Sequence, residues 1–185
     1  MTNGIKIKYL DTSVIVKLYL DEDGSLNFRD FFNNHTNFST TLMTFYESMS
    51  VLKSRLFNNK SKGQYYRAVD HLQIHGWGGK IEIEAIDLNS REIFREISEI
   101  SVEHNLDIAD AIQIYAILKG KYSGLCQGSG SVLITADEKQ ELAATEKGIR
   151  VWNCRKTAKP DGWITNRITS LLHSDRCFAA TIHLR

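Results

Sequence analysis

Short strand-like runs alternate with longer helical segments along most of this chain, and that alternation limits the fold more than any other feature. The runs expected as strands are residues 5–11, 37–39, 81–86, 132–135 and 149–152. Parallel strands need crossover connections of a dozen or more residues, usually helices, and at least one helical segment separates each run from the next. We therefore predict a three-layer α/β/α fold built on a mainly parallel sheet of about five strands.

The segments between these runs carry apolar residues at helical spacing. They predict helices over residues 13–20, 25–33, 41–57, 62–75, 90–104, 107–119 and 138–147. Ser39 or Thr40 is a suitable N-cap for the third helix, because a hydroxyl can accept a hydrogen bond from a free backbone N–H. The run Gly76-Trp77-Gly78-Gly79 is expected to end the fourth helix, since glycine disfavours helical structure.

Length and composition indicate one globular domain with a terminal extension. The chain has 185 residues, of which 42% are hydrophobic and 24% charged, so a substantial core can form. We expect one α/β domain over residues 1–155. The extension, residues 156–185, has a different character, with a candidate helix at 163–172 and a candidate strand at 178–184. The formal net charge of +1 neither requires nor excludes a nucleic-acid partner.

The cysteine content and the lack of long apolar runs favour a soluble cytoplasmic protein. Cys126, Cys154 and Cys177 are an odd number without the spacing of a disulfide framework, which suits reduced thiols in a cytosol. The N-terminus lacks the apolar core of a signal peptide, and no stretch reaches the ~18 apolar residues of a membrane span. We therefore expect a cytoplasmic location and no membrane partner.

Four acidic residues lie in uncharged surroundings, two at strand ends and two on apolar helices. Asp11 ends the first expected strand, and Asp137 follows the strand that ends at Thr135. Glu47 and Asp110 lie in helices with no lysine or arginine one turn away. Burying a lone carboxylate is costly unless it is paired with a cation. A shared Mg²⁺ or Mn²⁺ would satisfy all four, because hard divalent ions prefer carboxylate oxygens.

Each acid also has an explanation that needs no ligand. Asp107 and Asp110 fall in the first turn of their helix, where acids are favoured, and capping is the preferred role for Asp107. Asp137 could cap the helix that follows it, and Glu47 could point into solvent. The sequence leaves both kinds of explanation open for the four acids, although their positions together favour a site.

The same residues carry a resemblance to a known family. The motifs are Leu10-Asp11-Thr12-Ser13-Val14-Ile15-Val16-Lys17, then Glu47 on an apolar helix, then Asp110-Ala111-Ile112-Gln113-Ile114-Tyr115-Ala116, and finally Leu133-Ile134-Thr135-Ala136-Asp137. In order and spacing these motifs resemble the PIN-domain family, including its VapC-type toxin nucleases. The resemblance covers about residues 5–153. The Gly/Ser-rich loop at 123–130 and the extension from 156 are longer than a minimal member needs.

The resemblance implies a metal-dependent endoribonuclease that hydrolyses RNA phosphodiesters. Its catalytic residues, which hold Mg²⁺ or Mn²⁺, would be Asp11, Glu47, Asp110 and Asp137. Its supporting residues, which assist by hydrogen bonding, would be Thr12, Ser13 and Thr135. Such a site activates a water and stabilises charge on the phosphate oxygens, with two ions roughly 4 Å apart if both bind. As a toxin, the protein would have an antitoxin protein as its partner and would form a homodimer.

Other interpretations remain open. The chain could be a stand-alone RNA-processing nuclease or a PIN-fold binding module without turnover. A haloacid-dehalogenase-like phosphatase fits poorly, because it needs a second aspartate where Ser13 stands. A phosphoacceptor receiver domain would need a further acidic pair and a lysine at a late strand end. The pairs His71/His75 and His173/Cys177 lack the additional ligands of a zinc site.

No residue is assigned to RNA binding from the sequence. Basic side chains that follow the Glu47 helix could contact phosphates, although a solvated surface is the preferred interpretation; they are Lys53, Arg55, Lys60 and Lys62. Aromatic side chains could stack on bases, although packing within the protein is preferred for them; they are Tyr65, Tyr66 and Trp77.

Overall fold

The computed structural model describes residues 6–57, 61–125 and 130–156. Five strands of these residues form one sheet in the order β3-β2-β1-β4-β5, and every neighbouring pair is parallel. The strands are β1 (Lys6–Leu10), β2 (Phe38–Thr41), β3 (Ile81–Glu84), β4 (Gly130–Thr135) and β5 (Arg150–Asn153). All five predicted strands are present, and their ends differ from the expected ones by no more than two residues.

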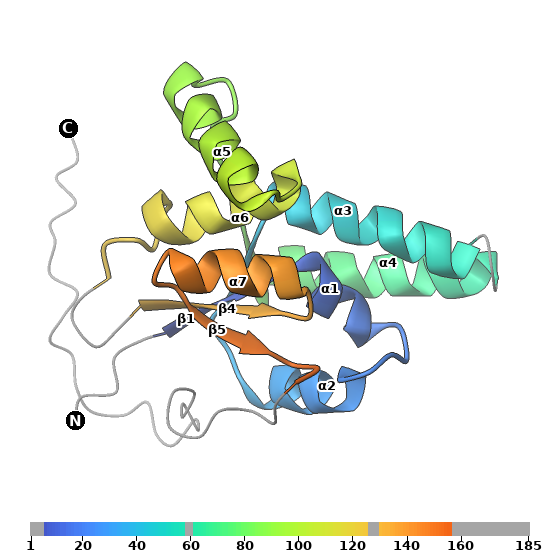
Figure 1. Ribbon diagram of the computed structural model, residues 1–185. Helices are drawn as coiled ribbons and strands as arrows, with labels where there is room; N and C mark the ends of the chain where they lie inside the picture. Colours follow the sequence, from blue (N-terminus) through green and yellow to red (C-terminus); the bar gives the residue numbers. More distant parts are fainter. Residues whose placement is uncertain (1–5, 58–60, 126–129, 157–185) are drawn as a thin grey trace, which may run out of the picture.

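Helices cover both faces of the sheet, as Figure 1 shows. They are α1 (Thr12–Ile15), α2 (Ser25–Asn34), α3 (Leu42–Leu52), α4 (Lys62–Trp77), α5 (Arg91–His104), α6 (Ile108–Lys119) and α7 (Glu138–Glu146). α1 continues into a 3₁₀ turn, η1 (Val16–Leu18), and α3 continues into a π-helical segment, η2 (Lys53–Phe57). The predicted three-layer α/β/α architecture is confirmed.

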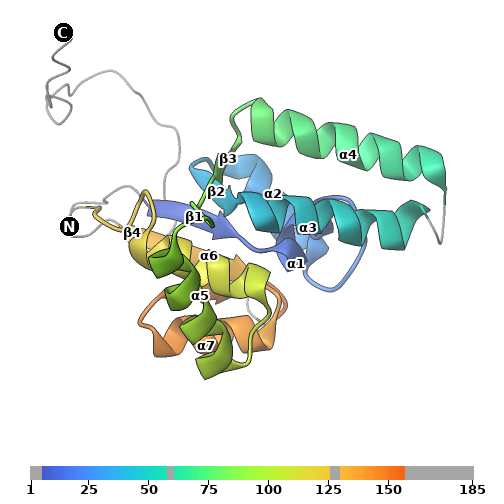
Figure 2. The same ribbon diagram turned by 90° about the horizontal axis from the view of Figure 1, so that it is seen from above.

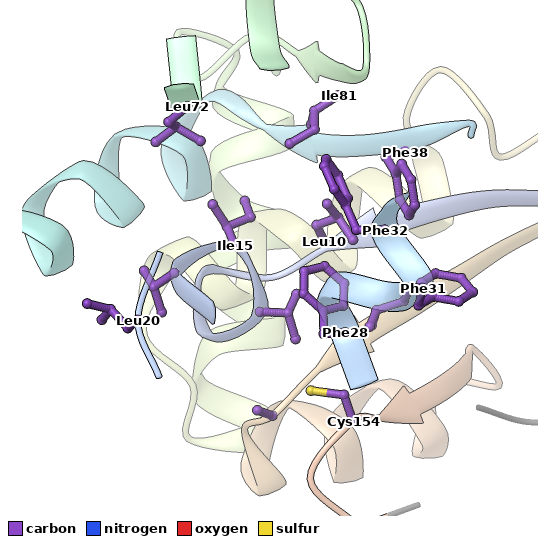
Figure 3. Close-up of a cluster of buried hydrophobic side chains, with 14 of the residues drawn as sticks. Leu10, Ile15, Leu20, Phe28, Phe31, Phe32, Phe38, Leu72, Ile81 and Cys154 are labelled. Carbon is purple, nitrogen blue, oxygen red and sulfur yellow. The ribbon is translucent and has the colours of Figure 1, made fainter. Parts of the chain in front are cut away.

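Two apolar clusters form, one on each face of the sheet, because alternate strand residues point in opposite directions. In β1, Leu10 belongs to one cluster and Tyr9 to the other. The first cluster packs α1 to α4 against the sheet, and Phe28, Phe31 and Phe32 of α2 are buried in it (Figure 3). The second cluster joins α5, α6 and α7 to β1 and β4. Figure 2 shows α5, α6 and α7 grouped together, apart from α3 and α4.

The helix that carries Glu47 differs from its prediction at both ends. Thr41, and not Ser39 or Thr40, is the N-cap, because β2 continues to Thr41. The Thr41 hydroxyl accepts a hydrogen bond from the Thr44 N–H at 3.2 Å. At the other end, the predicted single α-helix widens into η2 after Leu52.

α4 also continues beyond its predicted end, through Gly76 to Trp77. A Cβ atom at Gly76 would lie 2.9 Å from Cδ1 of Ile83 and 3.0 Å from Cε2 of Phe45. The glycine is therefore used for close packing of α4 against β3 and α3, and the helix ends only at Gly78.

The carboxyl ends of the strands meet at one edge of the sheet. Leu10 pairs in register with Ile134, and the Asp11 N–H donates to the Ile134 carbonyl at 3.1 Å. Thr135 at the end of β4 pairs with Asn153 at the end of β5. In open α/β sheets, ligands bind at this edge. The chain leaves this edge into α1 after β1, into α3 after β2 and into α7 after β4.

Several residues considered above lie outside the described part of the chain: Lys60, Cys126, His173, Cys177, residues 126–129 of the loop 123–130, and the segments 163–172 and 178–184. Within the described part, Cys154 is a buried free thiol. No helix in that part is long and apolar enough to cross a membrane.

Candidate active site

Asp11 lies between β1 and α1, and three donors hold its carboxylate. The backbone N–H of Ser13 donates to Oδ2 at 3.1 Å and the Thr135 hydroxyl donates to the same atom at 3.0 Å. The Ser13 hydroxyl is the third donor to Oδ2, and it accepts a hydrogen bond from the Ala136 N–H at 2.8 Å. Since Asp11 is only 3% exposed, its position is fixed by this network and not by solvent.

Glu47 projects from α3 toward the start of α1. The Thr12 hydroxyl donates to Glu47 Oε2 at 2.6 Å, and the glutamate is half-buried. Burial raises the pKa of the Glu47 carboxyl, the Thr12 hydrogen bond opposes that shift, and the nearby charges of Asp107 and Asp11 add to it. Glu47 therefore does not point into open solvent, which was one of the two interpretations of its sequence position.

Asp110 lies in the first turn of α6. Asp107 caps that helix by accepting the Asp110 N–H at 3.2 Å, so the capping role expected for Asp107 is confirmed. The Oδ1 atom of Asp110 accepts a hydrogen bond from Nε2 of Gln140 at 2.9 Å, and Gln140 is fully buried in α7. This bond joins α6 to α7 directly at the acid.

Asp137 follows the end of β4 by two residues and caps α7. Its Oδ1 atom accepts hydrogen bonds from the N–H groups of Lys139 at 2.8 Å and Gln140 at 2.9 Å. Its own N–H donates to the Thr135 hydroxyl at 2.9 Å. The capping interpretation is thus confirmed for Asp137, and the cap places its carboxylate at the same sheet edge as Asp11.

The four acids line one cavity of about 410 Å³ at the carboxyl edge of the sheet. Its walls come from α1, η1 and the loop after it, α3, η2, α6, the start of α7 and the residues after β5. They are Asp11, Thr12, Ser13, Val16, Lys17, Glu22, Asp23, Glu47, Val51, Arg55, Asp107, Asp110, Ala136, Asp137 and Arg155. Thr135 is fully buried and reaches the site through its bond to Asp11.

Burial and neighbouring carboxylates raise the pKa values of Asp110 and Glu47 in this cavity. Burial, together with the charges of Asp11, Asp107, Asp137 and Glu47, raises the pKa of Asp110 to about 8. Burial likewise raises the pKa of Asp11, although its hydrogen-bond donors oppose the shift. Within the described residues, no lysine, arginine or histidine nitrogen lies within 4.0 Å of the four predicted site carboxylates.

The chemistry of this donor set fits a hard divalent cation. Partly buried carboxylates that lie close together, with no basic nitrogen within ion-pair distance, are stabilised by a cation that prefers oxygen ligands. The residues that would hold it are Asp11, Glu47, Asp110 and Asp137. In the conformation described, however, no three histidine, cysteine, aspartate or glutamate side chains of the described residues are arranged to hold one ion. Side-chain rotation would have to bring the carboxylates together.

A buried amide connects the elements that carry three of the acids. Gln113 in α6 is fully buried; its Nε2 donates to the Leu10 carbonyl at 2.8 Å, and its Oε1 accepts from the Thr44 hydroxyl. Leu10 immediately precedes Asp11. Thr44 lies one turn before Glu47, and Gln113 lies one turn after Asp110. One side chain therefore fixes β1, α3 and α6 relative to one another beneath the cavity.

The sequence did not identify Gln113 and Gln140 as part of the site. A signal was present in the spacing. Gln113 lies three residues after Asp110, and Gln140 lies three residues after Asp137, so each amide faces the same side of its helix as the acid. Arg155, by contrast, reaches the cavity only because of how the chain folds, and no local spacing marks it. Lys17 lies four residues after Ser13 and ends the first motif quoted for the family resemblance.

Among the basic residues considered for phosphate contacts, Arg55 lines the cavity. Lys53 and Lys62 are not among the lining residues, and the ammonium group of Lys62 lies 5.2 Å from the centre of the Phe57 ring. The aromatic candidates Tyr65, Tyr66 and Trp77 do not line the cavity either.

The fold and the site together define a class of three-layer α/β protein with clustered carboxylates at the carboxyl edge of a parallel sheet. The PIN domain family matches residues 8–146, which is most of the chain. The chain belongs to the PIN domain family, as the sequence motifs indicated. PIN domains are generally nucleases. A search of curated proteins finds no match.

Three solved structures are similar to this one. PAE2754 from Pyrobaculum aerophilum has a TM-score of 0.52 at 19% identity, over 80% of this chain and 86% of that one. VapC20 from Mycobacterium tuberculosis, described as a toxin that cleaves the sarcin–ricin loop, has a TM-score of 0.55 at 14% identity, over 74% and 94%. FitAcB from Neisseria gonorrhoeae has a TM-score of 0.50 at 18% identity, over 82% and 100%. The likeness at these identities concerns the fold.

Proposed function

We propose that this chain is a Mg²⁺- or Mn²⁺-dependent endoribonuclease that hydrolyses RNA phosphodiesters. The observation that carries the proposal is the convergence of Asp11, Glu47, Asp110 and Asp137 on one cavity, where burial and the neighbouring acids raise the pKa of Asp110 to about 8. Membership of a family of nucleases supports hydrolysis as the reaction. The description of VapC20 as a toxin that cleaves the sarcin–ricin loop supports RNA as the substrate class.

In this proposal the chain's neutral donors position the reacting groups. Ser13 and Thr135 hold the Asp11 carboxylate at the centre of the site, and Thr12 holds the Glu47 carboxylate on the α3 wall. Hydroxyl groups orient carboxylates without adding a positive charge that would compete with the metal. The bound metal would supply positive charge at the phosphate and lower the pKa of the attacking water.

The reaction is tested by incubating total RNA with the wild-type protein in Mg²⁺, in Mn²⁺ and in EDTA. We expect cleavage that requires the metal. Asp11→Asn and Asp110→Asn should reduce it by more than the roughly 10- to 100-fold typical for partners of metal ligands. Asp70→Asn, an exposed aspartate of α4 that does not line the cavity, is the matched control and should cleave normally.

Unchanged cleavage in both site variants would contradict the assignment of the site. RNA binding by the wild type without cleavage in either metal would instead identify a PIN-fold binding module. Thermal unfolding gives a second readout, because an ion that binds only the folded state raises its stability with concentration. Mg²⁺ should raise the melting temperature of the wild type and of Asp70→Asn, and should leave that of Asp11→Asn unchanged.

We further propose that the nuclease is the toxin of a toxin–antitoxin pair, that it forms a homodimer, and that it acts in the cytoplasm. The description of VapC20 as a toxin supports the toxin role. Induced expression of the chain should arrest growth, and a short reading frame beside its gene should encode a protein that relieves the arrest and co-purifies with it. Normal growth and no such neighbour would favour a stand-alone RNA-processing nuclease.

A further inference from the structure

Two arginines line the acidic cavity without forming ion pairs. The side chains of Arg55 and Arg155 are exposed at the cavity wall. Within the described residues, neither guanidinium has a carboxylate oxygen within 4.0 Å. In a cavity with so many carboxylates, a cation that remains unpaired is available for an anionic ligand.

The other basic residues near this edge are already occupied or face elsewhere. Lys17 lines the cavity, but its side chain is buried and pairs with Glu22 at 3.3 Å. Lys156 pairs with Glu141 at 2.9 Å. Lys53 is exposed but does not line the cavity. Unlike any of these lysines, Arg55 and Arg155 both line the cavity and, within the described residues, form no ion pair.

The π-helical segment keeps Arg55 on the cavity side of its helix. Glu47, Val51 and Arg55 all line the cavity and are spaced four residues apart. In a regular α-helix, eight residues advance the side-chain direction by about 80° beyond two full turns. A π-helix closes i→i+5 hydrogen bonds and so contains more residues per turn, which cancels much of that drift between Val51 and Arg55.

Arg155 lies on the other side of the central acid. α3 follows β2 and Arg155 follows β5, whereas Asp11 follows β1, which lies between those two strands in the sheet. Arg155 and Asp23 also line a second hollow of about 400 Å³ next to the cavity. The cavity therefore adjoins a further hollow at Arg155, and in the order of the strands Asp11 lies between the elements that carry the two arginines.

We propose that Arg55 and Arg155 bind phosphates of a single RNA strand, one on each side of the phosphate that lies at the four carboxylates. This inference rests on the proposed nuclease function. Guanidinium groups bind phosphate oxygens through two parallel N–H donors, and such contacts fix the register of a strand without reading its bases. They also offset the repulsion between an acidic cavity and a polyanion, which the metal alone would offset only at the centre.

The test measures the salt dependence of RNA binding, because each phosphate contact to a single strand contributes about 0.7 to the slope of log affinity against log salt. A fluorescein-labelled 12-nucleotide RNA of mixed sequence is titrated with the Asp110→Asn protein in Mg²⁺ from 50 to 200 mM NaCl, and anisotropy is recorded. Either Arg55→Ala or Arg155→Ala, added to the Asp110→Asn protein, should reduce the magnitude of this slope by about 0.7. The two substitutions together should reduce it by about 1.4.

Three controls complete the experiment. Lys53→Ala removes a neighbouring charge and should leave the slope unchanged, whereas Arg55→Lys keeps the charge and should keep the slope. Competition with poly-glutamate tests whether the arginines bind an acidic protein instead of RNA. Unlabelled RNA should displace the labelled 12-mer far more readily than poly-glutamate does. The inference is overturned if the arginine variants match Lys53→Ala, if the 12-mer does not bind, or if poly-glutamate competes as well as RNA. Cleavage by the wild type decides the nuclease function separately, whichever slope is found.

Discussion

Thr12 donates the hydrogen bond that fixes the Glu47 carboxylate on the α3 wall. Thr12→Val keeps the shape of the side chain and removes that donor. We expect the cleavage rate at saturating Mg²⁺ to fall roughly 10- to 100-fold, the usual effect of losing a hydrogen-bonding partner of a metal ligand. Thr12→Ser restores the hydroxyl and should recover most of the rate. If the valine variant cleaves as fast as the serine variant, Glu47 does not depend on Thr12 for its position.

The raised pKa of Asp110 makes the stability of the metal-free protein depend on pH. The carboxyl has a pKa of about 8 in the folded protein, against an ordinary value of 3.8. Between these values the folded state holds a proton that the unfolded chain has released. The stabilisation is therefore complete below pH ~4 and is lost as the pH rises toward 8, with a slope of at most about 1.4 kcal/mol per pH unit.

Asp110→Asn should remove this slope, because the amide does not titrate and its oxygen can still accept from Gln140. Urea unfolding at pH 5, 6, 7 and 8 in EDTA measures the effect as the difference between wild type and variant. The wild type should lose stability relative to Asp110→Asn across this range, while Asp70→Asn should follow the wild type. A constant difference at all four pH values would show that Asp110 is ionised throughout.

At the residue scale, the sequence located the acids, and the family resemblance named the hydroxyls of Thr12, Ser13 and Thr135, which donate to Glu47 and Asp11. The buried amides of Gln113 and Gln140 were not identified. Asp11 and Asp137 were predictable because the carboxyl ends of parallel strands meet at one edge. Glu47 was predictable only as a charge in apolar surroundings. The contribution of Arg155 depends on the fold bringing distant segments together, and nothing in its immediate sequence marks it. The roles of the four acids as metal ligands stay a prediction until an ion is shown to bind.

At the scale of elements, the start of α2 is docked against the end of β5 through Gly24. Its φ is +84°, and a Cβ there would lie 2.6 Å from the Cys154 carbonyl oxygen. Gly148 has a similar φ of +76° but no atom within 4 Å of the corresponding position. A substitution at Gly148 therefore measures the cost of backbone strain alone, whereas one at Gly24 adds the cost of steric contact.

Gly148→Ala should lower the free energy of unfolding by about 1 kcal/mol, the cost of placing a side chain in the left-handed region. Gly24→Ala should cost about 2–4 kcal/mol, because overpacking against a backbone carbonyl adds to the same strain. Urea unfolding at neutral pH measures both. Equal losses in the two variants would mean that α2 can move away from β5 at little cost.

The sheet and helices were predictable because apolar spacing distinguishes period two from period 3.6. The π-helical turn at the end of α3 was not, since α- and π-helices share nearly the same apolar pattern. What distinguishes them is tertiary packing, here the burial of Leu56 in the first apolar cluster. Gly76 was misread as a helix end for the same reason, because its contacts with Phe45 and Ile83 come from other elements.

At the scale of the whole molecule, the sheet and both apolar clusters of the described residues lie between Lys6 and Cys154. The domain proposed for residues 1–155 and the extension proposed for 156–185 stay a prediction. We expect a chain that ends at Lys156 to fold, with a melting temperature within a few degrees of the full chain and the same metal-dependent cleavage. Circular dichroism and the RNA assay test this. Aggregation or a large drop in melting temperature would show that the extension belongs to the domain.

Gln113 ties the backbones of β1, α3 and α6 together beneath the acids. Asp11 is held by its three donors, and the other carboxylates, which are half-buried or exposed, can turn toward it by side-chain rotation alone, without movement of the elements that carry them. Exposed side chains change rotamer in picoseconds to nanoseconds, far faster than helices rearrange. Metal uptake should therefore be a single kinetic step. In stopped-flow mixing, its observed rate should rise linearly with ion concentration and show no plateau.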